Sequence, residues 1–262
     1  VVLFVLPAPF TPALIGVLSA VATYEIMHAI GMNHPRVGLY TAALALAIPF
    51  WVYFETPHVW AVTVLLAYLI LIFVEGFASG FRLKMERVGG AAFFAVFISY
   101  CLSSIVRIGM MDLRTSYIFL PIVIPFVGDA AAMFAGMAFG KHKLCPVVSP
   151  KKTVEGAIGG VLGTMVFGVV ATLIYSVAAD RMEAFTRSNI GVSMYVIIAL
   201  LGCVAAVLGI YGDLFASVVK RQCGIKDYGT IFPGHGGILD RFDSVMFIAP
   251  FVTMVITAVF YK

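Results

Sequence analysis

Residues 57–78 have the sequence PHVWAVTVLLAYLILIFVEGFA, and this run decides the class of fold. Among Lys, Arg, Asp and Glu it contains only Glu75, and about 20 apolar residues are enough to cross the hydrocarbon core of a bilayer as a helix. Similar apolar runs recur along the chain. We predict membrane-spanning helices near residues 9–31, 36–54, 57–78, 89–108, 115–139, 156–178, 190–217 and 242–261.

The composition of the whole chain agrees with this interpretation. Of its 262 residues, 62% are hydrophobic and 11% are charged, and the mean hydropathy is +1.05. A soluble domain of this length would need more charged residues to cover its surface. We therefore predict an all-α, polytopic integral membrane protein.

The segment before the first predicted span, Val1–Leu6, is apolar but too short to cross a membrane. We expect it to be the end of an N-terminal ninth helix, in addition to eight complete ones; a signal-peptide remnant or a re-entrant segment are the alternatives. The chain contains no repeat and no linker that would divide it. We predict a single transmembrane domain over 1–262, with an N-terminal part, 1–128, and a C-terminal part, 129–262.

The distribution of basic residues predicts which loops share a side of the membrane, because Lys and Arg in short loops are retained in the cytoplasm. Most of the 17 basic residues fall in alternate loops, at Arg36, Arg82, Lys84, Arg87, Lys141, Lys143, Lys151, Lys152, Lys220, Arg221, Lys226 and Arg241. We expect the two richest loops, 140–155 and 218–241, to lie together on the cytoplasmic face. Extensive polar chemistry should be sought there.

Two further classes of site are disfavoured by the sequence. The net charge of +4 is small and scattered, which argues against nucleic-acid binding. The four cysteines form no CxxC pair and no disulfide framework, and we interpret them as small hydrophobic residues.

A polar stretch near the C-terminus, residues 209–243, reads GIYGDLFASVVKRQCGIKDYGTIFPGHGGILDRFD. On a helix, Asp213, Ser217 and Lys220 share one face, because their spacing is i, i+4, i+7. Asp240 and Asp243 would share a face where the next helix begins. Carboxylates from two helix ends are suitable ligands for Mg²⁺, and the adjacent bases and glycines suit a polyphosphate.

Simpler interpretations exist for each of these residues taken alone. Asp240 and Asp243 could cap the start of the last helix. Asp213 could form an ordinary interhelical ion pair with Lys220, and Lys220 and Arg221 could anchor the chain at the cytoplasmic side. His235 alone would be an ordinary loop histidine. The functional interpretation rests on their concentration in one short segment.

A second polar block contains Asp129, then GKHKLCP at 140–146, then SPKKTVEG at 149–156. Its loop is basic and rich in hydrogen-bond donors, and it is predicted to lie on the same side as the first block. Lysines that interact with lipid headgroups are the alternative, which explains Lys141 and Lys143 better than the compact SPKKTVEG run. Glu25 and Glu75, toward the cytoplasmic ends of their helices, are attributed to snorkelling or to helix-packing hydrogen bonds.

The two blocks together resemble the phosphatidate cytidylyltransferases, also called CDP-diacylglycerol synthases. The resemblance is carried by SVVKR at 217–221, KDYG at 226–229 and FPGHGGILDRFD at 232–243, and by the second block. It covers the chain from Asp129 onward. Before Asp129, only the hydropathy is similar.

The resemblance implies transfer of the cytidylyl group of CTP to phosphatidic acid, which gives CDP-diacylglycerol and pyrophosphate. It also implies Mg²⁺, a second cation such as K⁺, a homodimer, and a bacterial inner membrane with the active site facing the cytoplasm. Our hypothesis makes Asp213 and Asp240 the principal Mg²⁺ ligands, with Asp243 as a further ligand or a supporting acceptor. The expected catalytic residues are Asp213, Lys220, Asp240 and Asp243.

The predicted substrate-binding residues are those that would hold the phosphates of CTP and phosphatidic acid. They are Ser149, Lys151, Lys152, Thr153, Ser217, Arg221, Lys226, Asp227, His235, Gly236, Gly237 and Arg241, with Asp129, Lys143 and Glu155 as further candidates. Two competing classes remain at this stage. One is a related CTP-dependent enzyme, such as a polyprenol kinase or an ether-lipid cytidylyltransferase. The other is an ion-coupled transporter that would use Asp129 and Asp213.

Overall fold

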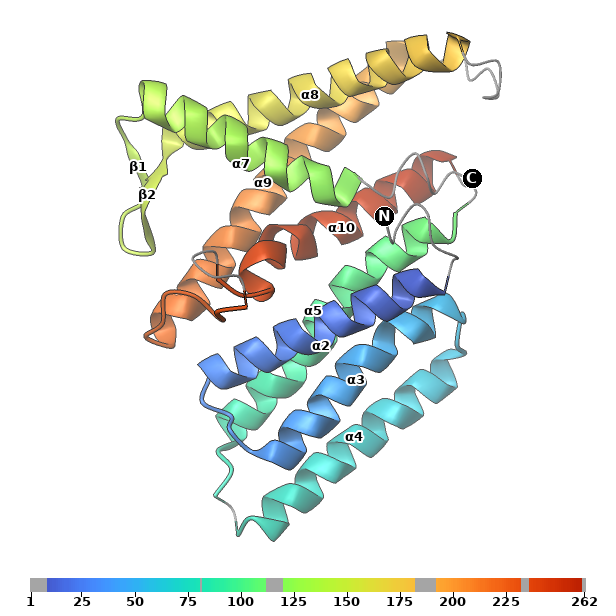
Figure 1. Ribbon diagram of the computed structural model, residues 1–262, viewed down its shortest axis with the longest axis vertical. Helices are drawn as coiled ribbons and strands as arrows, with labels where there is room; N and C mark the ends of the chain where they lie inside the picture. The colour runs from blue at the N-terminus through green and yellow to red at the C-terminus, as the bar shows by residue number, and fades with distance from the viewer. Residues whose placement is uncertain (1–8, 81, 112–119, 182–191, 232–235, 261–262) are drawn as a thin grey trace.

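The computed structural model describes residues 9–80, 82–111, 120–181, 192–231 and 236–260 (Figure 1). Within these ranges, eight helices are long and apolar enough to cross a membrane. The prediction of an all-α polytopic membrane protein is confirmed. The segment Val1–Leu6 lies outside the described residues.

The helices are α2 (Phe10–Ala29), α3 (Pro35–Tyr53), α4 (His58–Ala78), α5 (Met85–Gly109), α7 (Leu120–Phe139), α8 (Val154–Arg181), α9 (Val192–Gln222) and α10 (Leu239–Phe260). One antiparallel hairpin is formed by β1 (Lys143–Cys145) and β2 (Ser149–Thr153). This hairpin was not predicted, because strands of three and five residues leave too little alternation to detect.

The second of the two predicted cytoplasmic loops is shorter than expected, while the first, predicted at 140–155, lies between Phe139 and Val154. The helix α9 continues to Gln222 and α10 begins at Leu239, so the predicted loop 218–241 shrinks to residues 223–238. Lys220 and Arg221 lie in the last turn of α9, where positive charge is favourable beside exposed carbonyl groups. The polar residues Lys220 and Arg221 therefore belong to the end of α9 and not to the loop that follows it.

The N-terminal helices form one bundle, in which α2 and α3 pack on each other and on α5. Its core includes Met27, Val37, Leu44, Ile72 and Ala91. The helix α4 lies at the edge of the bundle (Figure 1) and is mostly exposed, with side chains such as Trp60 and Phe73 on its surface. An apolar, exposed helix of this kind is suited to contact with lipid.

The C-terminal helices α7, α8 and α9 pack against one another, and α10 contacts both α9 and the N-terminal helices α2 and α5. One apolar cluster includes Ile26 of α2, Leu102 of α5, Ala205 of α9 and Ile248 of α10. The helix α10 therefore joins the two bundles through a continuous core.

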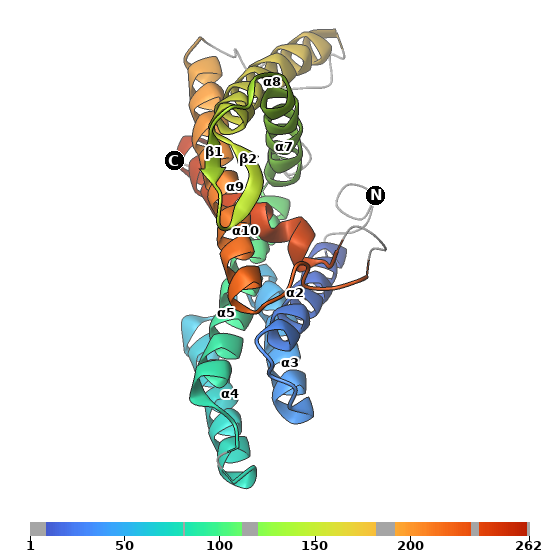
Figure 2. The same ribbon diagram turned by 90° about the vertical axis from the view of Figure 1, so that its left-hand side faces the viewer.

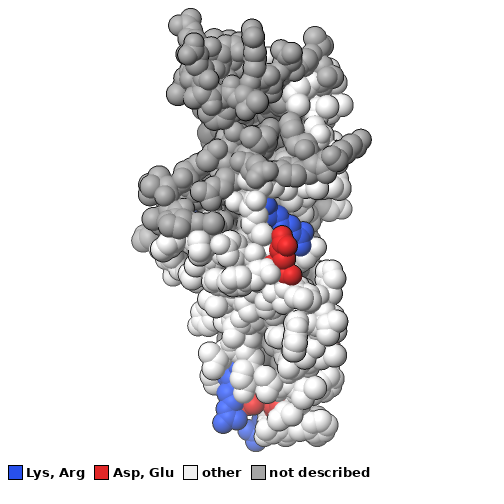
Figure 3. Space-filling model, turned by 90° about the vertical axis from the view of Figure 1, so that its right-hand side faces the viewer, with Lys and Arg blue, Asp and Glu red and all other residues white. Residues whose placement is uncertain are grey.

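Several connections lie on one side of the molecule, at the left in Figure 1. They are the α2–α3, α4–α5 and α9–α10 connections and the hairpin, and Figure 2 looks onto this side. The opposite side displays few charged side chains among the described residues (Figure 3). This arrangement agrees with the predicted grouping of the basic loops, while the side of a membrane that they face stays a prediction.

Candidate functional site

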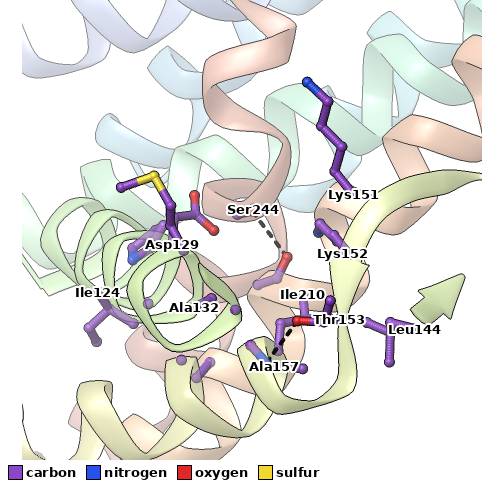
Figure 4. Close-up of a pocket in the computed structure, with 18 of the residues that line it drawn as sticks. Ile124, Asp129, Ala132, Leu144, Lys151, Lys152, Thr153, Ala157, Ile210 and Ser244 are labelled. Atoms are coloured by element: carbon purple, nitrogen blue, oxygen red, sulfur yellow. Dashed lines mark hydrogen bonds between the residues drawn. The ribbon is translucent and has the colours of Figure 1, made fainter. Parts of the chain in front are cut away.

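A cavity of about 420 Å³ opens between α7, α8, α9, α10 and the strand β2. Most of its wall is apolar, with Ile124, Leu144 and Ile210 among the lining residues. Its polar residues are Asp129, Lys151, Lys152, Thr153 and Ser244. Figure 4 shows Asp129, Lys152 and Ser244 around one space, while the side chain of Lys151 extends away from it.

Close packing of α7 on α8 shapes one wall of this cavity. A Cβ atom added at Gly159 or Gly163 of α8 would overlap the Cβ of Ala135 or Ala131 of α7. Small residues therefore let the two helices approach closely. At the start of α8, the backbone N–H of Gly156 donates a hydrogen bond of 3.1 Å to Oγ1 of Thr153 (Figure 4), which supplies an acceptor to the first turn.

The two polar blocks of the sequence meet at an ion pair between Lys152 of β2 and Asp213 of α9. Ser217 also donates a hydrogen bond of 3.3 Å to Oδ1 of Asp213. Nearby, Nε of Arg221 donates to the carbonyl oxygen of Val148, in the hairpin, over 3.4 Å. The predicted proximity of the blocks is observed, but Asp213 pairs with Lys152 and not with Lys220.

Two further acids lie close to these contacts. The α9 backbone at Gly212 packs directly on the backbone of Asp243 in α10, and Asp129 of α7 lines the cavity. Asp243 is 8% exposed, and its Oδ1 accepts a hydrogen bond of 2.7 Å from the backbone N–H of Ser244. Ser244 in turn donates over 3.0 Å to the carbonyl oxygen of Gly209, which holds α10 against α9. In the part of the chain that the structure describes, no group of three or more His, Cys, Asp or Glu side chains is arranged as a metal site.

Asp240 has a different set of contacts from Asp213. Its Oδ1 accepts a hydrogen bond of 2.8 Å from Nζ of Lys220, and its Oδ2 accepts bonds of 2.8 and 3.0 Å from the backbone N–H groups of Tyr228 and Gly237. The Lys220 and Asp240 side chains are only 12% and 7% exposed. Both backbone donors precede α10, so Asp240 ties the α9–α10 loop to the start of this helix, and these contacts compete with its predicted role as a metal ligand.

Tyr228 fixes the middle of the α9–α10 loop. Its hydroxyl donates a hydrogen bond of 2.9 Å to the carbonyl oxygen of Ala216, and Nζ of Lys220 lies 5.5 Å from its ring centroid. Burial raises the pKa of Tyr228, which keeps the phenol protonated as a donor. The loop is thus fastened to α9 as well as to α10.

Glu25 of α2 is a residue whose contact with this loop the sequence did not reveal. Its carboxylate accepts hydrogen bonds of 2.9 and 2.8 Å from the backbone N–H groups of Ile238 and Leu239. The only sequence signal is an acid inside an apolar helix. Glu75, by contrast, pairs with Arg36 over 3.3 Å and lies 3.6 Å from His34, away from the loop.

The remaining predicted residues are more peripheral. Those exposed at the surface are Lys143, Lys151, Arg221, Lys226, Asp227 and Arg241, while Ser149 is half-buried in β2 and Gly236 has a positive φ of 82°. Glu155 accepts a hydrogen bond from the His142 ring at 2.6 Å and another from the backbone N–H of Lys141 at 3.1 Å, so it organises the turn before β1. His235 lies outside the described residues.

Comparison with known proteins extends the resemblance over nearly the whole chain. A model described as the cytidylyltransferase family matches residues 1–259. The phosphatidate cytidylyltransferase of Bacillus subtilis (strain 168) is 30% identical over 249 residues, covering 93% of this chain and 87% of the relative. The proteins of the same name from Staphylococcus saprophyticus and Staphylococcus aureus (strain COL) are 39% and 36% identical over 166 residues, covering 60% of this chain and 58% of each relative.

The match begins well before Asp129, where the sequence alone showed only similar hydropathy. It includes both polar blocks and the N-terminal helix that carries Glu25. The family model and the alignment to the Bacillus subtilis protein together show that this chain belongs to the cytidylyltransferase family.

Proposed function

We propose that this chain is a phosphatidate cytidylyltransferase of phospholipid biosynthesis. A phosphate oxygen of phosphatidic acid attacks the α-phosphorus of CTP and forms a new phosphorus–oxygen bond. The bond from the α-phosphorus to the oxygen that bridges to the β-phosphorus breaks, and pyrophosphate leaves. CDP-diacylglycerol stays in the membrane through its acyl chains.

The observation that carries this proposal is the meeting of the two polar blocks at Lys152 and Asp213, beside a cavity with largely apolar walls. One reactant is a lipid and the other a polar nucleotide, so the site needs apolar and charged surfaces next to each other. Both reactants are anionic, and catalysis depends mainly on positioning them and neutralising their charge. No protein nucleophile is required.

We assign charge neutralisation to the basic residues around the cavity and the α9–α10 loop. Lys152 lies at the cavity wall, and Lys220 lies at the end of α9 beside the loop. The exposed residues Arg221 and Lys226 are placed to meet phosphates that arrive from the aqueous side. Thr153 lines the cavity as a further hydroxyl donor, and the exposed side chain of Lys151 extends away from the cavity (Figure 4).

We propose that Mg²⁺ is held at Asp213. Carboxylate oxygens are the ligands that Mg²⁺ prefers, and the backbone of Asp243 packs on Gly212, the residue next to Asp213. The ammonium group of Lys152 already shows that a positive charge is accommodated against Asp213. When bound, the ion would neutralise charge on the phosphates. Because the described side chains include no group of three such ligands arranged as a metal site, we propose Asp213 as its main protein ligand and Asp243 as a supporting acceptor. A second cation such as K⁺ stays a prediction without an assigned ligand set.

The location of the protein follows from its helices and from the positions of its basic loops. It is an integral membrane protein. We place the site on the cytoplasmic side of a bacterial inner membrane, where CTP is available, because the basic hairpin and the α9–α10 loop lie on the same side. A homodimer is proposed from the family resemblance alone.

The decisive test supplies the purified protein with phosphatidic acid, Mg²⁺ and CTP labelled separately at the α- and γ-phosphates. We expect the α-label in the lipid product and the γ-label in pyrophosphate. Transfer of the γ-label to lipid would instead identify a CTP-dependent kinase. Ion flux across proteoliposomes without any turnover of CTP would support a transporter.

A further inference from the structure

The helix α2 contributes an acidic side chain to the α9–α10 loop although it belongs to the N-terminal bundle. Glu25 is 4% exposed, and its two carboxylate oxygens accept separate hydrogen bonds, of 2.9 Å from Ile238 N–H and 2.8 Å from Leu239 N–H. Leu239 is the first residue of α10 and Ile238 directly precedes it, so neither N–H group has a partner inside the helix. A negative charge is favoured at this end of a helix dipole.

The same carboxylate packs directly on the backbone of the loop. A Cβ atom added at Gly229 or at Gly237 would overlap the carboxylate of Glu25. Both positions therefore need glycine as long as Glu25 keeps its place. Glu25 therefore contacts the α9–α10 loop at two separate positions, Gly229 and Gly237.

Asp240 contacts the same two parts of the loop. It accepts hydrogen bonds from the backbone N–H groups of Tyr228, which is next to Gly229, and of Gly237. The loop backbone is thus held between two carboxylates, Glu25 from α2 and Asp240 from α10. Asp240 is neutralised by Lys220, whereas Glu25 is held by backbone N–H groups. A carboxylate accepts one bond on each of its two oxygens, whereas a Gln side chain of the same shape would place an NH₂ donor against one of the two N–H groups.

We infer that Glu25 is a positioning residue for cytidylyl transfer. It fixes Gly229, Gly237 and Ile238 relative to the start of α10, and so sets the position of the backbone N–H groups there and of the first turns of α10, which carry Asp240 and Asp243. This inference rests on the proposed function. It assigns to the N-terminal bundle a direct part in shaping the nucleotide side of the site.

The first experiment compares Glu25→Gln with Glu75→Gln in the full chain, purified in mixed micelles that contain phosphatidic acid. Glu75 is a matched control, because it is also a buried acid (6% exposed) but pairs with Arg36 away from the loop. We expect Glu25→Gln to raise the KM for CTP or lower kcat at least about tenfold, since misplacing a binding group is costly. The KM for phosphatidic acid should stay within about twofold of the wild-type value, because a change that misplaces the nucleotide leaves the lipid contacts in place. Glu75→Gln should stay close to the wild type in all three values.

Hydrogen exchange separates positioning from a general loss of stability. In Glu25→Gln, amides of residues 236–240 should exchange faster, while amides of α7 and α8 and the unfolding midpoint should match those of Glu75→Gln. Equal effects on both substrates together with faster exchange throughout the chain would overturn the inference. Unchanged kinetics and unchanged exchange in Glu25→Gln would also overturn it.

A double-mutant cycle tests the contact itself. Gly237→Ala should impair the enzyme in the presence of Glu25, because the new methyl group meets the carboxylate, and should cost less activity in a Glu25→Ala background, where that space is free. Additive effects would contradict the inference, and the Gly237→Ala arm remains informative if Glu25→Gln does not fold. If the wild-type protein forms no CDP-lipid, the proposed function fails, while the exchange measurement and CTP binding still decide whether Glu25 orders the loop.

Discussion

At the scale of single residues, the ion pair of Lys152 with Asp213 gives the sharpest prediction. Lys152→Met should lower kcat by about 100-fold, as removal of one donor to developing charge does in other enzymes. The side chains of the pair are 26% and 29% exposed, so the protein should still fold. The measurement is the rate of lipid labelling from α-labelled CTP, with the exposed Lys141→Met as the control. Near-normal kcat in Lys152→Met would remove Lys152 from the catalytic centre.

Asp240 offers a second test, because its two proposed roles predict different outcomes. If it mainly organises the loop, Asp240→Asn leaves Lys220 buried without its partner and should destabilise the protein by about 3 kcal/mol. Adding Lys220→Met to Asp240→Asn should then cost less than the sum of the single changes. Chemical denaturation in detergent micelles measures both effects. Native stability combined with a large rise in the Mg²⁺ requirement would favour the role of metal ligand.

The sequence predicts site residues well where polar residues are concentrated in one segment. It predicts them less well where a side chain has its hydrogen-bond partners on a distant helix. The two blocks around Lys152 and Asp213 were identified because charged residues are rare in this chain. From the sequence, Glu25 is attributed to snorkelling or to a helix-packing hydrogen bond. Its partners in the structure are backbone N–H groups more than 200 positions away. Backbone donors leave no signature in a sequence, so the part that Glu25 plays could not be predicted.

At the scale of the elements, the contact between α7 and α8 depends on small residues. Gly159→Leu should force the helices apart at Ala135 and distort the cavity that they line, at a cost of about 1–3 kcal/mol for overpacking. Activity should fall with stability, measured by lipid labelling and by thermal unfolding. Gly89→Ala on α5, where an added Cβ meets no atom within 4 Å, is the control and should change neither value.

The length of α9 explains why its end was harder to predict than its existence. Its 31 residues rise about 46 Å, which exceeds the roughly 30 Å of a hydrocarbon core. An upright helix of this length would carry Asp213, Ser217 and Lys220 toward the interface. The hydropathy of the sequence located the apolar part of α9, but the polar last turns depend on Tyr228 and the hairpin, which are contacts of the folded chain.

At the scale of the whole molecule, the loops on one side predict a topology that labelling can test. In a background without the native cysteines, Lys84→Cys and Lys226→Cys should react with a membrane-impermeant maleimide from the cytoplasmic side, because both residues are exposed. Glu55→Cys, in the α3–α4 connection, should react from the other side. Inside-out and right-side-out vesicles provide the two measurements. Labelling of Lys84→Cys and Lys226→Cys from opposite sides would refute the arrangement.

The position of α10 between the two bundles limits how parts of this protein could be exchanged with those of a relative. If α2 came from one parent and the α9–α10 loop with α10 from another, the chimaera would have to recreate the fit of Glu25 to Gly229 and Gly237. It would also have to recreate the apolar core that α2 and α10 share. The edge helix α4, which is largely exposed, imposes far weaker demands on its neighbours. Chimaeras should therefore fold when α2, α5 and α10 come from one parent. The helix α4 should accept the sequence of a relative most readily.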